Sequence, residues 1–406
     1  MRVALFHNLP SGGGKRAVQE WTRRLAPMHE IDVYTLSTAD HAFCDIRPFV
    51  TAHREYPFSP ARLFRSPFGR LNQLQRWRDL GRLARTGQHV ARDIDTQKYD
   101  VVLAHSCQFT STPLLLGFTG CPTVFYLHEP LVRSDDNAAG LAHRPSHSLR
   151  DEVDRIDPLM RLYRCRLEGL QARCAKATTR LLANSAFTGA LTLGAYGVPS
   201  LVCPCGVDTE RFRVLPDAVK GGHVLSVGEL SARKGFAFLV EALGAIPAAQ
   251  RPALRLACNV VLDAERRRVE ALAAALGVEL AILQGLGTAD LVREYNAAAL
   301  CVYAPIREPF GLVALESMAC GTPLVAVAEG GFQECMLHQQ HGLLVSRDAA
   351  EFAGAVASLL STPALAREYG ANARAHVERH WTWQRSSDAL NRHLEEVAGG
   401  RASTGP

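Results

Sequence analysis

Short apolar runs alternate along this chain with longer segments in which apolar residues recur at helical spacing. In the first half, the runs predict strands at residues 3–6, 31–36, 101–104, 123–127 and 181–183. In the second half, they predict strands at residues 224–227, 254–258, 281–283, 300–303, 324–328 and 343–345. Strands that alternate with helices form parallel sheets, because a parallel connection needs room for a crossover helix. Two such series predict an α/β protein with two Rossmann-like domains.

The break between the two series lies at residues 208–221, where turn-forming residues interrupt regular structure. We therefore predict a hinge there, between an N-terminal domain of residues 1–207 and a C-terminal domain of residues 222–378. Residues 381–398 carry a helical pattern and are predicted to form the last helix. In sheets of this kind, ligands bind beyond the carboxyl ends of the strands.

Composition agrees with two globular domains. The chain has 406 residues and a net charge of +5, and 47% of its residues are hydrophobic and 21% charged. Its eleven cysteines include no C-x-x-C pair, so we interpret them as reduced, mostly buried thiols of a cytoplasmic protein rather than a metal site. The opening MRVALFHNLP has too short an apolar run for a signal peptide. The longest apolar stretch, residues 113–127, is too short and too interrupted to span a bilayer.

A basic stretch at residues 54–92 contains nine Arg and only two acidic residues. Phe58, Phe64, Phe68 and Trp77 are interleaved with these arginines. Such a stretch can lie on an anionic membrane surface, here the inner face, or bind an anionic acceptor such as a lipid diphosphate. The alternative is an ordinary solvated helix. Because the stretch contains no recognised nucleic-acid-binding motif, we expect no nucleic-acid partner.

The most specific chemistry lies in residues 308–334, which read EPFGLVALESMACGTPLVAVAEGGFQE. Gly311 precedes a predicted helix, whose N-terminus offers N–H groups and partial positive charge to a diphosphate. Glu316 lies about one turn inside this helix, where a carboxylate can accept hydrogen bonds from a vicinal diol such as a ribose. Glu308 precedes the helix, nearer the phosphate end and the sugar hydroxyls beyond it. The alternative is an amphipathic helix with a surface Glu at each end.

This segment resembles the E-x7-E signature of glycosyltransferase family 4, with Ser317 where the family usually has Ala. The resemblance implies a retaining enzyme with the GT-B fold, in which two Rossmann-like domains face each other across a cleft and the last helix crosses back to the N-terminal domain. It also implies that Phe310, Gly311 and Leu312 bind the donor beside Glu316, and that Glu308 is catalytic.

Residues 227–235, VGELSARKG, resemble the family's G-R-L-x-x-x-K-G. The resemblance implies that Lys234 binds the donor diphosphate as a point charge. Glu229 stands where the family usually has a phosphate-binding Arg, and a carboxylate there repels a diphosphate. Either Arg233 supplies the missing charge, or Glu229 turns away or binds a hydroxyl. Cys205 stands where Asn is common, in a segment expected to form the interdomain turn.

The first loop, SGGGKR at residues 11–16, resembles the family's glycine-rich loop, which implies donor contact at Gly13 and Gly14. Lys15 is a weaker acceptor-side residue, with a solvated helix residue as the alternative.

His128 ends a predicted strand, and the resemblance implies a catalytic histidine in the cleft there. His105 and Ser185 are weaker acceptor-side residues. Most histidines are structural, and Ser185 can be a simple helix cap.

We therefore interpret the chain as an enzyme for the metal-independent transfer of a hexose from a nucleotide-diphosphate sugar to a glycan or lipid-linked acceptor, with no cofactor. The fragment TVFYLHEPLVR resembles mannosyltransferase-like members, so GDP-mannose is the first expectation, and UDP-sugars remain open. One alternative is a catalytically silent nucleotide-sugar-binding protein of the same fold. Another is a nicotinamide oxidoreductase, which needs G-x-G-x-x-G where this chain has SGGGKR.

Overall fold

The computed structural model describes residues 1–64, 71–129 and 157–400, and the chain divides into two compact units. Unit 1 comprises Met1–Pro204 together with the chain from Ser386 onward, and unit 2 comprises Cys205–Arg385. The stretch predicted as a hinge, residues 208–221, belongs to unit 2 in this division. The predicted domain boundaries themselves stay a prediction, because compactness alone does not locate a hinge.

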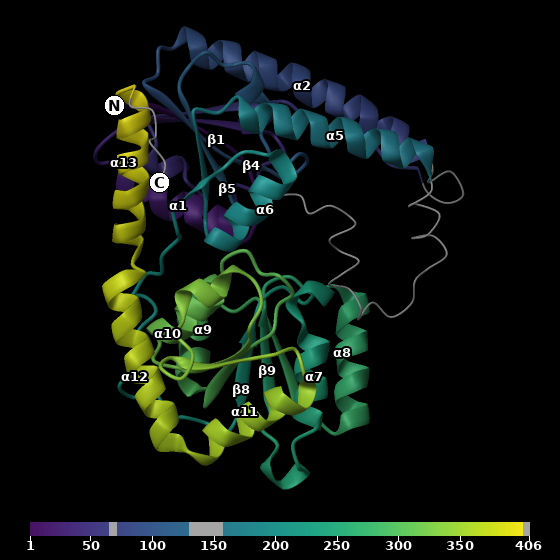
Figure 1. The fold of residues 1–406 in the computed structure, drawn as a ribbon, viewed down its shortest axis with the longest axis vertical. Helices are drawn as coiled ribbons and strands as arrows, with labels where there is room; N and C mark the ends of the chain where they lie inside the picture. The colour runs from purple at the N-terminus through teal and green to yellow at the C-terminus, as the bar shows by residue number, and fades with distance from the viewer. Residues whose placement is uncertain (65–70, 130–156, 401–406) are drawn as a thin grey trace. The chain divides into compact units, whose positions relative to one another are not determined.

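Unit 1 contains a sheet of seven parallel strands in the order β3-β2-β1-β4-β5-β6-β7 (Figure 1). The five strands predicted for this half are confirmed, and two edge strands were missed. β3 reads AHREY, which has too few apolar residues to stand out, and β7 is two residues long. The strands are β1 (Arg2–Asn8), β2 (Glu30–Leu36), β3 (Ala52–Tyr56), β4 (Val101–Cys107), β5 (Thr123–Leu127), β6 (Arg180–Ala183) and β7 (Leu201–Val202).

Unit 2 contains six parallel strands in the order β10-β9-β8-β11-β12-β13. All six strands predicted for the second half are confirmed. They are β8 (Val224–Val227), β9 (Leu254–Cys258), β10 (Leu280–Gln284), β11 (Leu300–Tyr303), β12 (Leu324–Val327) and β13 (Gly342–Val345). β11 and β12 are buried throughout, and β8 is buried except for Val227 at its end, as expected for parallel strands that helices cover on both faces.

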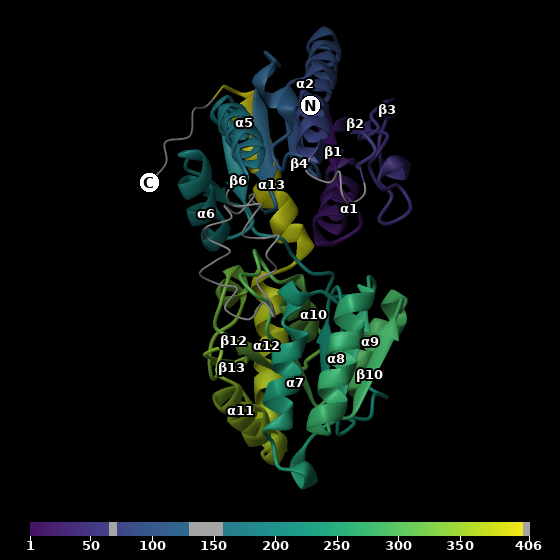
Figure 2. The same ribbon diagram turned by 90° about the vertical axis from the view of Figure 1, so that its right-hand side faces the viewer.

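Helices connect the strands and bury their apolar sides against the sheets. In unit 1 they are α1 (Gly13–Leu25), α2 (Asn72–Thr96), α5 (Pro158–Lys176), α6 (Ala186–Tyr196) and α13 (Trp383–Ala398), and α2 lies beside α5 (Figure 1). In unit 2 they are α7 (Phe236–Gly244), α8 (Asp263–Leu276), α9 (Thr288–Ala297), α10 (Leu312–Ala319), α11 (Ala349–Ser361) and α12 (Pro363–His380), and α7 lies beside α8 (Figure 2). Short 3₁₀ turns are η1 (Arg47–Phe49), η3 (Leu114–Gly117), η4 (Ala232–Lys234), η5 (Ala248–Gln250) and η6 (Gly331–Cys335).

The basic stretch at residues 54–92 is partly internal. Leu80, Leu83 and Val90 of α2 are buried in the core of unit 1. Phe58 is also buried, and the Arg166 guanidinium lies 4.4 Å from the centre of the Trp77 ring. Of the other two aromatics, Phe64 is exposed and Phe68 lies outside the described residues.

Within the described residues, no single helix has the length and apolar content needed to cross a bilayer. Only α11 and α12 taken together, with a bend of 98° between them, reach that length and apolar content.

The chain returns to unit 1 at Ser386, on α13. The indole N–H of Trp21 on α1 donates to Ser386 Oγ at 2.8 Å, and that hydroxyl donates to the Pro204 carbonyl at 2.6 Å. Both side chains are buried. This relay joins the first helix, the last helix and the end of the N-terminal segment of unit 1.

We expect Ser386→Ala to lower the free energy of unfolding by about 1–3 kcal/mol, because it leaves the buried indole N–H of Trp21 and the carbonyl of the half-buried Pro204 without their shared partner. Ser358 is exposed on α11, so Ser358→Ala is the matched control and should change stability by less than about 0.5 kcal/mol. Chemical denaturation measures both, and equal stability of the two variants would contradict the role given to the relay.

Candidate functional site

Two predicted site residues of unit 2 contact each other directly. The Lys234 ammonium lies 2.9 Å from Glu308 Oε1 and 2.7 Å from Oε2, and the two side chains are 19% and 16% exposed. Lys234 ends η4 in the loop after β8, and Glu308 lies in the loop after β11. β8 and β11 are neighbours, and the strand order reverses between them. In open parallel sheets this switch point is the usual ligand site.

The backbone around Glu308 is tightly constrained. Gly331 N–H donates to the Glu308 carbonyl at 2.7 Å. Gly330 has φ +83°, and a Cβ there would lie 2.5 Å from the same carbonyl oxygen. Arg307 also has positive φ, at 50°. The double glycine therefore fixes the loop that presents the Glu308 carboxylate.

The helix that follows, α10, begins without a side-chain cap. Gly311 is its N-cap at φ +96°, and a Cβ there would lie 2.4 Å from Phe332 Cβ. Phe310 is buried and Leu312 is half-buried. Because no side chain caps them, the first backbone N–H groups are suited to an anionic ligand. The helix predicted after Gly311 is confirmed as α10.

Glu316 is held inside unit 2. It is 4% exposed, and the Tyr295 hydroxyl of α9 donates to its Oε2 at 3.0 Å. The pKa of Tyr295 is raised, mainly by burial and secondly by the charge of the Glu316 carboxylate. The phenol therefore stays protonated and can donate at neutral pH. The alternative of a surface Glu is therefore wrong at this position. Sequence reasoning missed Tyr295 because it lies 21 positions away on another helix.

The loop after β8 also contains Glu229, which replaces the family's usual phosphate-binding Arg, and Arg233, which is predicted to supply the missing charge. Arg233 and Glu229 are both exposed, and the Arg233 carbonyl accepts from Ile306 N–H at 2.8 Å. Exposure lets the Glu229 carboxylate point into water. The role of Arg233 in supplying charge stays a prediction.

In unit 1, the predicted catalytic histidine has a histidine partner. His128 follows β5 and His105 lies on the neighbouring β4, and His105 Nδ1 is 3.2 Å from His128 Nε2. The Trp21 ring stacks on His105 with centroids 5.7 Å apart. A Cβ on Gly14 would lie 3.3 Å from His128 Cγ, so this glycine packs against the imidazole. Gly13, the first residue of α1, is exposed.

The backbone of His128 is held by a residue whose role the sequence did not reveal. Asn184 Nδ2 donates to the His128 carbonyl at 2.8 Å. The next residue, Ser185, is buried and accepts from Thr188 N–H at 3.0 Å as the N-cap of α6. The helix-cap alternative for Ser185 is therefore confirmed, and its acceptor-side role stays a prediction.

Burial keeps these histidines neutral. It lowers the pKa of His128 to about 3 and also holds the pKa of His105 well below its usual range. An efficient general base or acid has a pKa near the working pH. His128 is therefore suited to positioning a hydroxyl by hydrogen bonding rather than to carrying a proton.

Lys15 is almost fully buried, at 1% exposure, so the alternative of a solvated helix residue is wrong. Its Nζ lies 3.1 Å from Nε2 of the buried His7, at the carboxyl end of β1. Burial lowers the pKa of Lys15 to about 8. An ammonium with an imidazole partner is expensive to bury, and the acceptor-side role of Lys15 stays a prediction.

Comparisons with known proteins agree with this geometry. The family model described as Glycosyltransferase Family 4 matches residues 11–211, and the model described as Glycosyl transferases group 1 matches residues 208–376. The chain belongs to glycosyltransferase family 4.

Curated relatives cover the chain to different extents. The D-inositol 3-phosphate glycosyltransferase of Geodermatophilus obscurus is 36% identical over 58% of this chain and 55% of its own length. The protein of the same name from Thermobispora bispora is 29% identical over 95% of this chain and 91% of its own. The chain spans about half the length of the first curated relatives it matches.

Solved structures show the fold. Sucrose-phosphate synthase from Thermosynechococcus elongatus matches with a TM-score of 0.73 at 21% identity, covering 98% of this chain and 99% of that one. Anabaena HepE in complex with UDP and glucose matches with a TM-score of 0.72 at 18% identity, covering 97% and 99%. The expected GT-B fold, with its two Rossmann-like units, is confirmed.

One departure from the family 4 pattern has a structural explanation. Ser317 stands in place of the usual Ala, and its buried hydroxyl donates to the Thr322 carbonyl at 2.8 Å, which ties α10 to the turn that follows it. Cys205 is buried, and all eleven cysteines are free thiols, eight of them buried, as predicted.

We expect Lys15→Met to raise stability in a pH-dependent way. Below pH 8 the lysine is charged in both states, so its burial destabilises the native state. Between pH 8 and 10.5 the native state loses its proton first, so this destabilisation shrinks as pH rises. The gain from the substitution should fall from at most about 3 kcal/mol at pH 7 to less than about 1 kcal/mol at pH 10.

Denaturation at both pH values measures this gain, with the exposed Lys176→Met as the control that should show no such trend. An equal gain in the free energy of unfolding at the two pH values would show that the pKa of Lys15 is not lowered in the folded protein.

Proposed function

We propose that this chain is a retaining glycosyltransferase that moves a hexose from a nucleotide-diphosphate sugar to an acceptor hydroxyl. The observation that carries the proposal is the Lys234–Glu308 pair at the switch point of the unit 2 sheet, in the loops that precede α7 and α10. The ammonium and the uncapped start of α10 suit a leaving diphosphate, and the carboxylate suits a sugar. A pair of this kind supplies both charges that glycosyl transfer requires.

In the proposed reaction, the bond between the sugar's anomeric carbon and the diphosphate oxygen breaks. The acceptor oxygen forms the new bond on the same face, and its proton passes to the departing phosphate oxygen. Lys234 and the first N–H groups of α10 would stabilise the negative charge that grows on the diphosphate. Glu308, released from Lys234 as that ammonium turns to the phosphate, would hold the sugar hydroxyls and stabilise positive charge at the anomeric carbon.

The remaining roles follow from burial and charge. Glu316, fixed by Tyr295, would hold the ribose. His128, neutral at physiological pH, would hold a hydroxyl of the sugar or acceptor. No metal is needed at the diphosphate in this proposal, because an ammonium and backbone dipoles supply the positive charge.

Names of related proteins help to choose substrates. HepE has been solved with UDP and with UDP-glucose, which favours uridine over the guanosine of GDP-mannose. The relatives named for D-inositol 3-phosphate add a phosphorylated polyol to the glycan and lipid-linked acceptors that we expect. Residues 130–133 of the mannosyltransferase-like fragment lie outside the described residues.

A catalytically silent sugar-nucleotide-binding protein is the second proposal that an observation favours. Glu229 places a carboxylate where the family has a phosphate-binding Arg. A silent protein binds the donor and never turns it over, so product formation separates the two proposals.

We expect Lys234→Met to weaken UDP binding and Glu308→Gln not to weaken it. Loss of the ammonium should weaken UDP binding by about 10- to 100-fold, because a charge-assisted contact is lost. Glu308→Gln removes the carboxylate that neutralises Lys234, so UDP should bind as tightly as to the wild type or more tightly, while sugar transfer falls. Calorimetry measures affinity, and release of UDP from UDP-hexoses with and without acceptors measures turnover.

The exposed Lys176→Met is the control for Lys234→Met and should leave UDP affinity unchanged. EDTA should also leave UDP affinity unchanged if no cation bridges the diphosphate. Weaker UDP binding by Glu308→Gln, or an EDTA effect that Mg²⁺ reverses, would contradict the donor site. Tight UDP binding without turnover on any acceptor would favour the silent protein.

We also propose that unit 1 contacts an anionic membrane surface at the inner face of the membrane. Leu63, Phe64, Leu71 and Leu74 are exposed large apolar residues next to exposed arginines of the basic stretch.

The purified chain should co-sediment with phosphatidylglycerol vesicles and not with phosphatidylcholine vesicles, because the arginines need an anionic surface. Phe64→Ser with Leu74→Ser should abolish this binding. Leu262→Ser with Leu337→Ser, which alters equally exposed residues of unit 2, is the control that should retain it. Equal sedimentation of both double variants would refute the proposed surface.

A further inference from the structure

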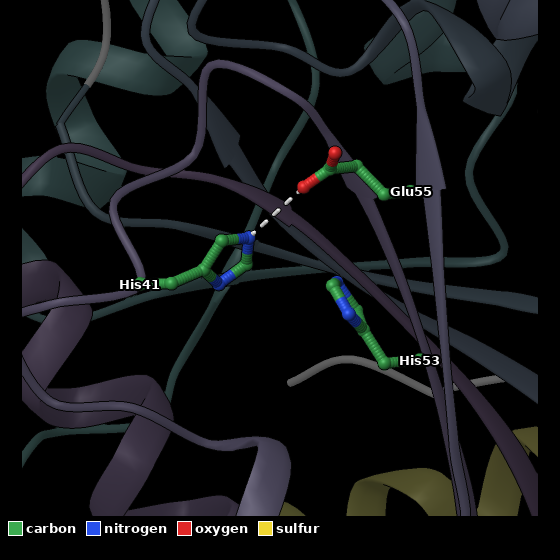
Figure 3. A group of neighbouring side chains, drawn as sticks. All are labelled: His41, His53 and Glu55. Atoms are coloured by element: carbon green, nitrogen blue, oxygen red, sulfur yellow. Dashed lines mark ion pairs between the residues drawn. The ribbon is translucent and has the colours of Figure 1, made fainter.

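Three metal-ligating side chains gather at the edge of the unit 1 sheet, where the His41 ring lies 6.4 Å from the ring of His7, the partner of Lys15. His53 and Glu55 occupy alternate positions of the edge strand β3 and therefore share a face. His41 comes from the loop that connects β2 to β3 (Figure 3). One ligand atom from each residue lies within 4.8 Å of the other two, and His41 Nε2 is 3.5 Å from Glu55 Oε2.

His41 lacks the contacts that a buried imidazole normally has. Both of its ring nitrogens are buried, and neither has a hydrogen-bond partner among the described residues. Leaving a buried polar group unsatisfied costs about 1–3 kcal/mol. A ligand that binds one of these nitrogens would remove that penalty.

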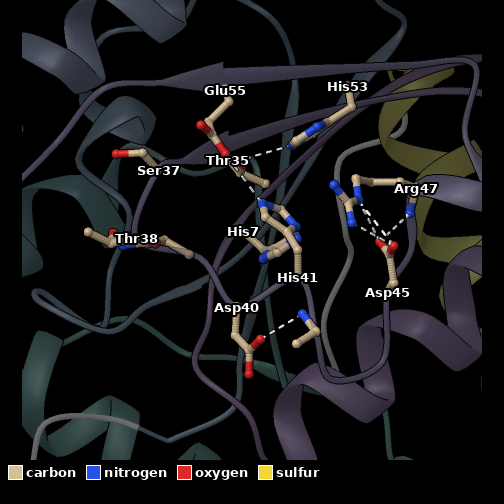
Figure 4. Close-up of polar contacts among 12 residues, drawn as sticks. His7, Thr35, Ser37, Thr38, Asp40, His41, Asp45, Arg47, His53 and Glu55 are labelled. Atoms are coloured by element: carbon tan, nitrogen blue, oxygen red, sulfur yellow. Dashed lines mark hydrogen bonds and ion pairs between the residues drawn. The ribbon is translucent and has the colours of Figure 1, made fainter.

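His53 already has the second partner that metal-binding histidines usually have. Its Nε2 lies 2.8 Å from the hydroxyl of the buried Thr35 on β2 (Figure 4). In metal sites, the ring nitrogen that does not bind the metal is commonly held by such a hydrogen bond, which fixes the tautomer. Thr35 pairs in register with Glu55, so the sheet itself sets this arrangement.

The loop that carries His41 is built to hold its position. The Asp40 carboxylate accepts from Ala42 N–H at 2.8 Å. Asp45 forms an ion pair with Arg47 at 2.9 Å, which neutralises the guanidinium that follows His41 in the same connection (Figure 4). A cation at the cluster would thus meet a carboxylate ligand and a paired arginine.

We propose that His41, His53 and Glu55 bind one divalent cation of the Zn²⁺ class. Two imidazoles and a carboxylate are a common zinc ligand set, which leaves a fourth position for water or an anionic oxygen. Zinc bonds of about 2.0–2.1 Å place tetrahedral ligands about 3.4 Å apart, close to the present 3.5 Å between His41 and Glu55. Glu55 is 47% exposed, so its side chain has room to close the remaining distance.

This proposed site is separate from the donor site of unit 2. The expectation of no metal rested on the cysteines, which lack zinc spacing, whereas this ligand set uses two histidines and a glutamate that folding brings together. A bound cation would tie the β2–β3 loop to the edge strand. It leaves the metal-free diphosphate binding of unit 2 unaffected.

The test uses the full chain purified without a polyhistidine tag and stripped with a chelator. Zn²⁺ titration should show about one tight equivalent, and Co²⁺ should give the visible absorption of a tetrahedral site. His41→Ala and Glu55→Gln should each abolish the Co²⁺ absorption, and circular dichroism should show that they remain folded. Thr35→Val keeps all three ligands and should weaken Zn²⁺ affinity by about 10- to 100-fold, as loss of an outer-shell partner does.

His89→Ala, on the exposed side of α2, is the matched control and should bind like the wild type. Wild-type affinity that survives in the folded Glu55→Gln variant, or no tight equivalent in the wild type, would overturn the proposal. Tight binding that disappears with His89→Ala would assign the metal to another surface.

Discussion

The ion pair between Lys234 and Glu308 joins two loops that leave neighbouring strands where the strand order of the unit 2 sheet reverses. Each partner alone would be a charge held in a crowded, partly buried loop. Together they neutralise each other until a ligand separates them. In the proposed reaction, a diphosphate would compete for the ammonium, and the carboxylate would then be released toward the sugar. The site would thereby couple donor binding to the exposure of the charge that stabilises the reacting carbon.

Backbone conformation explains why this pair occupies its position. Gly330 and Gly311 have positive φ, and any side chain at either residue would collide with the Glu308 carbonyl or with Phe332. The loop before α10 is therefore formed by close packing of backbone on backbone. That packing leaves the start of α10 without a side-chain cap and suited to an anion. In unit 1, burial acts differently, because it keeps His105 and His128 neutral and makes Lys15 an unusually weak base.

Most strands of both sheets were predictable from the sequence because they are short apolar runs. The E-x7-E segment was predictable because its residues lie close together along the chain. β3 was missed because an edge strand that reads AHREY lacks an apolar signal. Tyr295, Asn184 and His7 were missed because each acts on a residue brought near only by folding. The burial of Lys15 could not be predicted either, since a lysine after three glycines at the start of a helix resembles a solvated residue.

A crystal structure of the chain with bound UDP tests the central claim most directly. The account predicts diphosphate density against Lys234 Nζ and the first N–H groups of α10, with the Glu308 carboxylate turned away from the ammonium. Density for the diphosphate elsewhere, with the Lys234–Glu308 pair intact, would contradict it.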